Sequence, residues 1–143
     1  MAITQLSIFL ENTPGTLSEV IDTITEADIN LRALSVAETK DFGILRIIVS
    51  DIKKTKEALD DNAMIRETPV VVVKMNDNAG ALKKILDILK KAEINIEYIY
   101  AFPGVLHGSA YVVFRVDDLE VAEKILEQNN IKSLNNEDLK ELL

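Results

Sequence analysis

Apolar residues follow the same arrangement in both halves of the chain. From Leu6 to Leu10 every second position is apolar, a period typical of a β-strand. An apolar stripe at helical spacing follows over residues 17–27, which predicts an amphipathic helix. Both features return further along, in residues 71–75 and 82–92. Each half is therefore expected to open with a strand followed by a helix.

Two β-rich runs and a second helix complete each half. The first pair of strands is expected to turn at Asp41-Phe42-Gly43, a polar-to-glycine signal that suits a hairpin. The expected elements are strands 29–39 and 44–50, helix 52–59 and strand 64–67, then strands 94–102 and 109–116, helix 119–127 and strand 131–134. Residues 135–143 are expected to add a short helix capped by Asn136. The order βαββαβ, found twice, predicts an α+β fold of two tandem ferredoxin-like repeats, each an antiparallel sheet with its helices on one face.

The two halves also share residues at matching positions. Gly15-Thr16-Leu17 recurs as Gly80-Ala81-Leu82, and the same offset matches Gly43 with Gly108. We place the boundary at Thr68-Pro69, because proline lacks an amide donor and suits the beginning of a strand. The expected domains are residues 1–68 and residues 69–143.

The loop between the first strand and the first helix has similar chemistry in both halves. It reads Asn12-Thr13-Pro14-Gly15-Thr16-Leu17 in one and Asp77-Asn78-Ala79-Gly80-Ala81-Leu82 in the other. A helix N-terminus presents unpaired amide donors and a partial positive charge, so it can attract a carboxylate. Glycine gives a ligand access to the backbone, and Asn12 or Asp77 could hold an amino group beside that carboxylate. The alternative is ordinary helix capping by Thr13 or Asn78, with Pro14 in a first turn.

Asn30 and Asn95 follow the first helix of each half, at the start of the second strand. Asparagine commonly adopts the left-handed conformation that ends a helix. We also expect the loop and the second strand to lie at the same end of the sheet. Asn12 with Asn30, and Asp77 with Asn95, would then converge on one ligand.

These motifs resemble the ACT domain family over nearly the whole chain. The resemblance depends on Asn-Xaa-Pro-Gly-Xaa-Leu after a strand and Ile29-Asn30-Leu31 at the start of the next. It implies a regulatory protein that binds an amino acid at the interface between paired units, as in phosphoglycerate dehydrogenase and aspartate kinase. On the family pattern, the ligand-binding residues are Asn12, Gly15 and Asn30 in the first half and Asp77, Gly80 and Asn95 in the second. The other candidate ligand-binding residues are Pro14 and Leu17 of the first loop, Asn78 and Leu82 of the second loop, and Tyr100.

Some positions depart from the family pattern. The second half has Asp77 in place of asparagine and Ala79 in place of proline. Leu10 and Met75 stand where serine-binding members carry histidine, which counts against serine as the ligand.

An aromatic row distinguishes the second half. Tyr98, Tyr100 and Phe102 stand where the first half has small residues at 33, 35 and 37. Because alternate residues of a strand share a face, this row could form the wall of a pocket for a larger apolar or aromatic side chain. Packing in a core or an interface is the alternative.

Composition excludes several classes of function. The 143 residues include no cysteine and one histidine, His107, so disulfides and Cys/His zinc sites are absent. A net charge of -8 disfavours nucleic acid as a partner. No stretch approaches the ~20 apolar residues of a membrane span, and the start lacks a basic segment followed by an apolar one, so we expect a cytoplasmic protein with no membrane partner.

We expect no enzymatic activity and no cofactor, because no nucleophile with a base, and no paired acids, occur at a suitable spacing. The expected function is amino-acid sensing, passed on to a separate enzyme or transporter, with amino-acid metabolism as the setting. One alternative is an interaction or oligomerisation module without a ligand. In both halves the third strand is apolar on both faces, which suggests cover beyond the two helices. Side-by-side sheets or a homodimer would provide this cover, and we expect a homodimer. A remote alternative is an RRM-like RNA binder, because residues 108–114 weakly match an aromatic third-strand motif.

Overall fold

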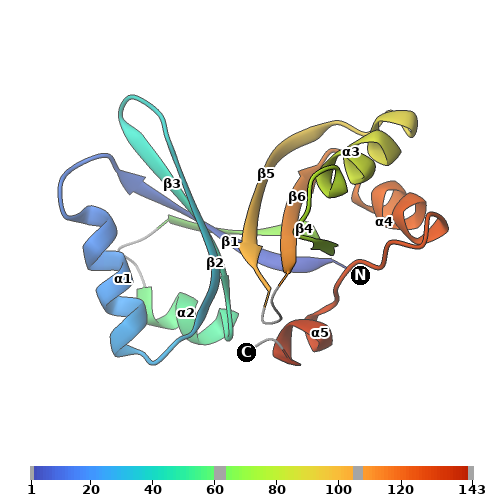
Figure 1. Cartoon of the computed structure of the whole chain (residues 1–143). Helices are drawn as coiled ribbons and strands as arrows, with labels where there is room; N and C mark the ends of the chain where they lie inside the picture. The colour runs from blue at the N-terminus through green and yellow to red at the C-terminus, as the bar shows by residue number, and fades with distance from the viewer. Residues whose placement is uncertain (1, 60–63, 105–107, 142–143) are drawn as a thin grey trace. The chain divides into compact units, whose positions relative to one another are not determined.

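A computed structural model describes residues 2–59, 64–104 and 108–141 (Figure 1). His107 lies outside the described residues. The chain divides into two units, Thr4–Thr68 and Pro69–Leu142, with Met1–Ile3 joined to the second. We call the two units the first and second repeat. No helix in the described parts of the chain is long and apolar enough to cross a membrane.

The first repeat contains strands in the order β2-β3-β1. Its elements are β1 (Ile3–Glu11), α1 (Thr16–Glu26), β2 (Leu31–Glu38), β3 (Phe42–Val49), α2 (Ile52–Leu59) and the beginning of β4 (Met64–Asn76). Both strand pairs are antiparallel, with Leu6 opposite Ile47 in β1·β3 and Val36 opposite Leu45 in β2·β3. The β4 residue Thr68 lies beside β1, since its hydroxyl is 3.1 Å from that of Ser7.

The core of the first repeat lies between the helices and one face of this sheet. Alternate residues of β1 and β3 meet the apolar stripe of α1 and the end of α2. The buried members are Leu6, Ile8, Leu10, Ile24, Ile29, Leu45, Ile47, Val49 and Leu59. Each fully buried Leu or Ile side chain contributes roughly 1.5–3 kcal/mol, so burial in this layer stabilises the repeat.

The second repeat has the same plan, with strands in the order β4-β6-β5. Its elements after β4 are α3 (Ala81–Lys91), β5 (Ile96–Pro103), β6 (Ser109–Val116), α4 (Leu119–Gln128) and the short α5 (Asn136–Glu141). Its core is centred on Phe114, which is fully buried among residues of α3, α4 and β4. Two antiparallel sheets, each with two helices packed on one face, confirm the predicted α+β fold of tandem ferredoxin-like repeats.

The strand registers correct one match between the two halves: the constant offset that paired Gly43 with Gly108 does not hold in the second hairpin. Gly43 lies opposite Leu10, and the equivalent partner of Met75 is Ala110, so Gly43 corresponds to Ala110 and not to Gly108. The reason is loop length: residues 39–41 join β2 to β3, whereas residues 104–108 join β5 to β6. The longer second loop shifts all later equivalences, and Asp51 matches Asp118 at the starts of α2 and α4.

Strand β4 also differs from the expectation. The sequence suggested a strand ending near residue 67 and a new one beginning at Pro69, but a single strand runs from Met64 to Asn76. Proline blocks one amide donor without bending an extended chain, because its fixed φ lies in the extended region. The carbonyl of Pro69 still accepts a hydrogen bond from Nη1 of Arg115 at 2.9 Å.

The C-terminal segment differs from the sequence-based expectation in two ways. The expected strand at 131–134 is a single bridge between Val73 and Ser133, supported by a hydrogen bond from the Leu134 amide to the Val72 carbonyl. The cap of the last helix is Asn135 and not Asn136: Asn135 Oδ1 accepts from the Asp138 amide at 2.8 Å, and Asp138 Oδ2 accepts from the Asn135 amide at 2.9 Å. This reciprocal pair is a capping box.

Candidate functional site

The first helix of each repeat begins at a glycine in the left-handed conformation. Gly15 has a φ of 88° and Gly80 a φ of 89°. A Cβ placed on either residue would meet nothing within 4 Å, so the space above both helix starts is open. These glycines are therefore needed for backbone conformation, and they leave room for a ligand to approach the chain.

Neither helix start has a side-chain cap. Thr13, expected as a capping type, instead shares a hydrogen bond of 2.6 Å with the hydroxyl of Thr16. The Asn78 side chain likewise gives no capping hydrogen bond to α3. The interpretation of capping by side chains is wrong on this point. The first helical amides, those of Thr16 and Ala81, donate to the backbone carbonyls of Thr13 and Asn78 at 3.4 and 3.3 Å, and no side chain caps either helix. The first turns of α1 and α3 keep amide donors and a partial positive charge to offer to an anion.

Asn12 and Asn30 lie at opposite ends of the first sheet. Asn12 Nδ2 donates to the Thr39 carbonyl at 3.5 Å, at the hairpin that joins β2 to β3. The Asn30 amide donates to Ser50 Oγ at 3.1 Å, beyond the other end of β3. β1 and β2 run parallel, because each pairs antiparallel with β3, so α1 returns the chain along the length of the sheet before β2 begins. The expected convergence of Asn12 with Asn30 within one repeat is therefore wrong.

The second repeat shows the same separation. The Asp77 amide donates to the Gly108 carbonyl at 2.8 Å, whereas the Asn95 amide donates to Asp117 Oδ1 at 3.1 Å, past the far end of β6. Neither asparagine is left-handed. That conformation is adopted two residues earlier, by Asp28 (φ 55°) and Glu93 (φ 57°).

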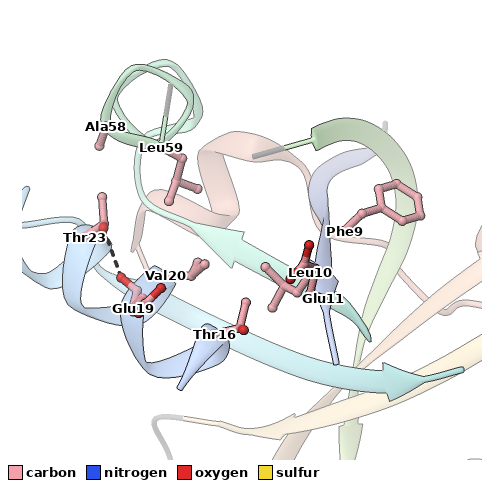
Figure 2. Close-up of a pocket in the computed structure, with 9 residues that line it drawn as sticks. All are labelled: Phe9, Leu10, Glu11, Thr16, Glu19, Val20, Thr23, Ala58 and Leu59. Carbon is pink, nitrogen blue, oxygen red and sulfur yellow. Dashed lines mark hydrogen bonds between the residues drawn. The ribbon is translucent and has the colours of Figure 1, made fainter. Parts of the chain in front are cut away.

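A pocket opens beside the start of α1 (Figure 2). Its volume is about 510 Å³. Thr16, Glu19, Val20 and Thr23 come from α1, Leu10 and Glu11 from the end of β1, and Ala58 and Leu59 from α2. Phe9 completes the lining, but its side chain points away from the others in Figure 2.

A second pocket, of about 540 Å³, occupies the equivalent place in the second repeat. It is lined by Lys74, Met75, Asn76, Asn78, Ala79, Gly80, Ala81, Lys84, Ile85 and Ile131. Six of these residues are the equivalents, 65 positions on, of residues that line the first pocket. Both volumes fall in the range of roughly 300–1,000 Å³ that is usual for small-molecule sites.

Few residues from the implied binding set line these pockets. Asn78 and Gly80 do. The others are not in either lining: Asn12, Pro14, Gly15, Leu17, Asn30, Asp77, Leu82, Asn95 and Tyr100. Leu17 and Leu82 are 39% and 36% exposed, on the outer side of the helix starts.

Sequence reasoning missed the residues one helical turn after each glycine. Glu19 and Lys84 each follow the glycine by four positions, and their amides bond to the carbonyls of Gly15 and Gly80. Helical spacing could have identified both, because positions i and i+4 share a helix face.

Tyr100 belongs to the aromatic row, which does lie on one strand face. It stands opposite Val113 on β6, whereas Phe114 and Val112 face the helices. Phe102, two residues on, stacks against Tyr111 with ring centroids 5.1 Å apart. The row is therefore on the face away from α3 and α4, and Phe102 serves packing.

The family model for the ACT domain pair matches residues 1–143. This chain is an ACT domain pair. The agreement extends from β1 to the terminal helix and confirms the family that the loop motifs suggested.

This ACT domain pair is similar to three further proteins. A structure from Bacteroides thetaiotaomicron is 40% identical with a TM-score of 0.90, over 99% of this chain and 98% of that one. The regulatory subunit of aspartate kinase from Thermus thermophilus has a TM-score of 0.62 at 16% identity, over 87% and 91% of the two chains, a likeness of fold alone. The acetolactate synthase small subunit of Buchnera aphidicola is 28% identical over 102 residues, which span 58% of this chain and 63% of that subunit.

Proposed function

We propose that this ACT domain pair binds a free amino acid beside the start of the first helix of a repeat and regulates a separate enzyme of amino-acid metabolism. The observation that carries the proposal is the pair of equivalent pockets, each beside a helix that starts at a left-handed glycine without a side-chain cap. Such a start offers amide donors to the carboxylate that every amino acid carries. We propose that the protein itself catalyses no reaction.

The binding step is tested with the intact chain. Each of the twenty amino acids is added in a thermal-shift assay, and hits are measured by titration calorimetry. A ligand at about a hundred times its Kd should add about 2.7 kcal/mol of stability, which is a shift of several degrees. If no amino acid at millimolar concentration shifts the melting temperature, ligand binding is wrong for this protein.

The loop assignment is tested with variants that keep the backbone conformation. Gly80→Asn and Gly15→Asn each place a side chain in the open space above one helix start, and asparagine tolerates a positive φ. We expect loss of amino-acid binding in the variant whose substitution lies at the pocket that binds the ligand in the wild-type protein. The circular dichroism spectrum of that variant should be unchanged. Binding that survives in both variants would show that the ligand lies elsewhere.

The regulated partner is proposed by analogy with the names of the relatives. The acetolactate synthase small subunit and the aspartate kinase regulatory subunit suggest a catalytic subunit of amino-acid biosynthesis. We expect the chain to change the response of such an enzyme to the bound amino acid, with a coupling of about 1–3 kcal/mol, or 5–150-fold in affinity. Assays of the acetolactate synthase and aspartate kinase catalytic subunits of the same organism, with and without the chain and the amino acid, measure this. Unchanged activity in every mixture counts against these partners.

An interaction module is the second candidate function, and the exposed edge of the first sheet favours it. β2 is the outer strand of that sheet, and Leu34 and Val36 on it are 53% and 48% exposed. An edge strand presents unpaired backbone groups that can pair with a second copy of the chain. We propose a homodimer through β2, and expect Leu34→Lys with Val36→Lys to produce a monomer in analytical ultracentrifugation. A dimer that survives both lysines would exclude this edge.

A further inference from the structure

The two equivalent pockets carry opposite charge. The first pocket is lined by Glu11 and Glu19, and their equivalents in the second pocket are Asn76 and Lys84. Residues 9–19 contain these two glutamates and no lysine or arginine, whereas residues 74–84 contain three lysines and one aspartate. The helix start, the glycine conformation and the cavity size are the same in both places. Among the six equivalent positions, charge is therefore the main difference between the two sites.

Lys84 is the residue that dominates this difference. It lies on α3 one turn after Gly80 and lines the pocket. Its ammonium pairs with no carboxylate among residues 2–59, 64–104 and 108–141, whereas the neighbouring Lys83 is bound to Asp87 at 2.7 Å. Lys74 also borders the pocket, but strand alternation places its side chain on the face away from Met75 and the helices. The second pocket thus has two features that attract an anion: the start of α3 and the Lys84 ammonium.

Resting on the proposed function, we infer that the second repeat selects an amino acid with a carboxylate side chain and that the first repeat rejects it. The α-carboxylate lies at the first turn of α3, and the side-chain carboxylate pairs with Lys84. Asn78 lines the same pocket and can donate hydrogen bonds to either group. In the first repeat, Glu19 stands at the place of Lys84 and would face the second carboxylate with like charge.

The test uses probes that differ only in charge. L-Aspartate and L-glutamate are compared with L-asparagine and L-glutamine by titration calorimetry on the full chain. We expect one acidic amino acid to bind with one site per chain, and at least about tenfold more tightly than its amide, since a hydrogen bond to a charged group contributes about 1.5–3 kcal/mol. Because the charged groups are exposed, this preference should decrease as salt is raised. Equal binding of acid and amide would overturn the inference.

Variants assign the preference to the pocket. Lys84→Glu should weaken binding of the acidic amino acid at least about tenfold, whereas Lys91→Glu, the same change at the far end of α3, should leave it unchanged. Glu19→Lys combined with Glu11→Asn should make the first pocket resemble the second and raise the stoichiometry from one site to two. Unchanged affinity in Lys84→Glu, or a stoichiometry that stays at one in the double variant, would overturn the inference.

The experiments distinguish failure of the proposed amino-acid binding from failure of the inferred preference for an acidic side chain. If a neutral amino acid binds and neither aspartate nor glutamate does, amino-acid sensing stands and the acidic preference is wrong. If none of the twenty binds, both are wrong.

Discussion

At the scale of single residues, two glycines determine the shape of the candidate sites. Gly15 and Gly80 have nearly identical φ values of 88° and 89°, and an L-residue with a side chain is strained there by about 1–2 kcal/mol. With glycine at the cap position, neither helix has a side-chain cap, and only the first amide of each is bonded, to the backbone carbonyl of Thr13 or Asn78. The positive φ of each glycine is therefore part of the fold, and the missing side chain leaves open the space in which a ligand is proposed to bind.

We expect Gly80→Ala to lower the free energy of unfolding by about 1 kcal/mol because of this strain, and Gly80→Asn to lower it less. Gly43→Ala is the matched control. Gly43 does not have a positive φ, and its Cβ would meet only the Ala37 carbonyl oxygen at 3.9 Å. Urea denaturation of the three variants measures the differences, and equal stability of Gly80→Ala and wild type would contradict the argument.

Asp87 on α3 offers a prediction about pH. A hydrogen bond from Lys83 lowers the pKa of Asp87 below its ordinary value, with smaller contributions from the charges of Lys83, Lys90 and Lys91. A lowered folded-state pKa stabilises the protein above the ordinary value, and this contribution is lost as the pH falls through the folded-state pKa. Lys83→Met should therefore raise the pKa of Asp87, measured by NMR titration of its carboxyl carbon. Lys84→Met, which removes a charge that does not contribute, should leave it unchanged.

At the scale of elements, the helices of each repeat begin in two different ways. α1 and α3 start at glycine without a side-chain cap, whereas Asp118 Oδ1 accepts from the Val121 amide at the start of α4. Asp51 does the same for the Lys54 amide at α2, at 2.9 Å. The second helix of each repeat is thus closed by its own side chain, and the first is open. This contrast is why the pockets at α1 and α3 are candidates for ligand binding.

The contrast gives a stability prediction for two residues of similar type. Asp118→Ala should cost about 1 kcal/mol, because the Val121 amide loses its acceptor. Asn78→Ala should cost much less, because the Asn78 side chain makes no capping hydrogen bond to α3 and alanine keeps the carbonyl that accepts from the Ala81 amide. Chemical denaturation compares the two, and a larger loss in Asn78→Ala would show that Asn78 does cap α3.

At the scale of the whole molecule, each repeat has its own core, and β4 contributes residues to both units. Phe114 is fully buried in the second core and stands opposite Ile99, which is 41% exposed on the outer strand β5. Substituting Phe114 and Ile99 one at a time therefore compares the contribution of a core residue to the free energy of unfolding with that of a partly exposed one.

We expect Phe114→Ala to destabilise the protein by about 3–5 kcal/mol through lost burial and the cavity it leaves. Ile99→Ala should cost less than about 1 kcal/mol, because a partly exposed side chain leaves no enclosed cavity. Urea denaturation followed by circular dichroism measures both. A small effect of Phe114→Ala would mean that the second core contributes little to stability.

The duplicated unit, the ACT family and the order of elements apart from the continuous β4 and the missing strand at 131–134 were determined by the sequence. These features depend on local periodicity and on short motifs, which residues near one another in the chain encode. The predicted start of the helix at residue 52 agrees with α2, because the side chain of Asp51 directly before it caps the first turn.

Tertiary structure alone decided which residues share a place in space. The return of the chain through α1 separates Asn12 from Asn30. The longer loop of the second hairpin makes Ala110, and not Gly108, the equivalent of Gly43. Two residues of each pocket also come together only because a strand end packs beside a helix. Glu11 and Glu19 line the first pocket, and Asn76 and Lys84 line the second. Such contacts join residues through strand register and packing, which the local pattern of a single strand or helix does not specify.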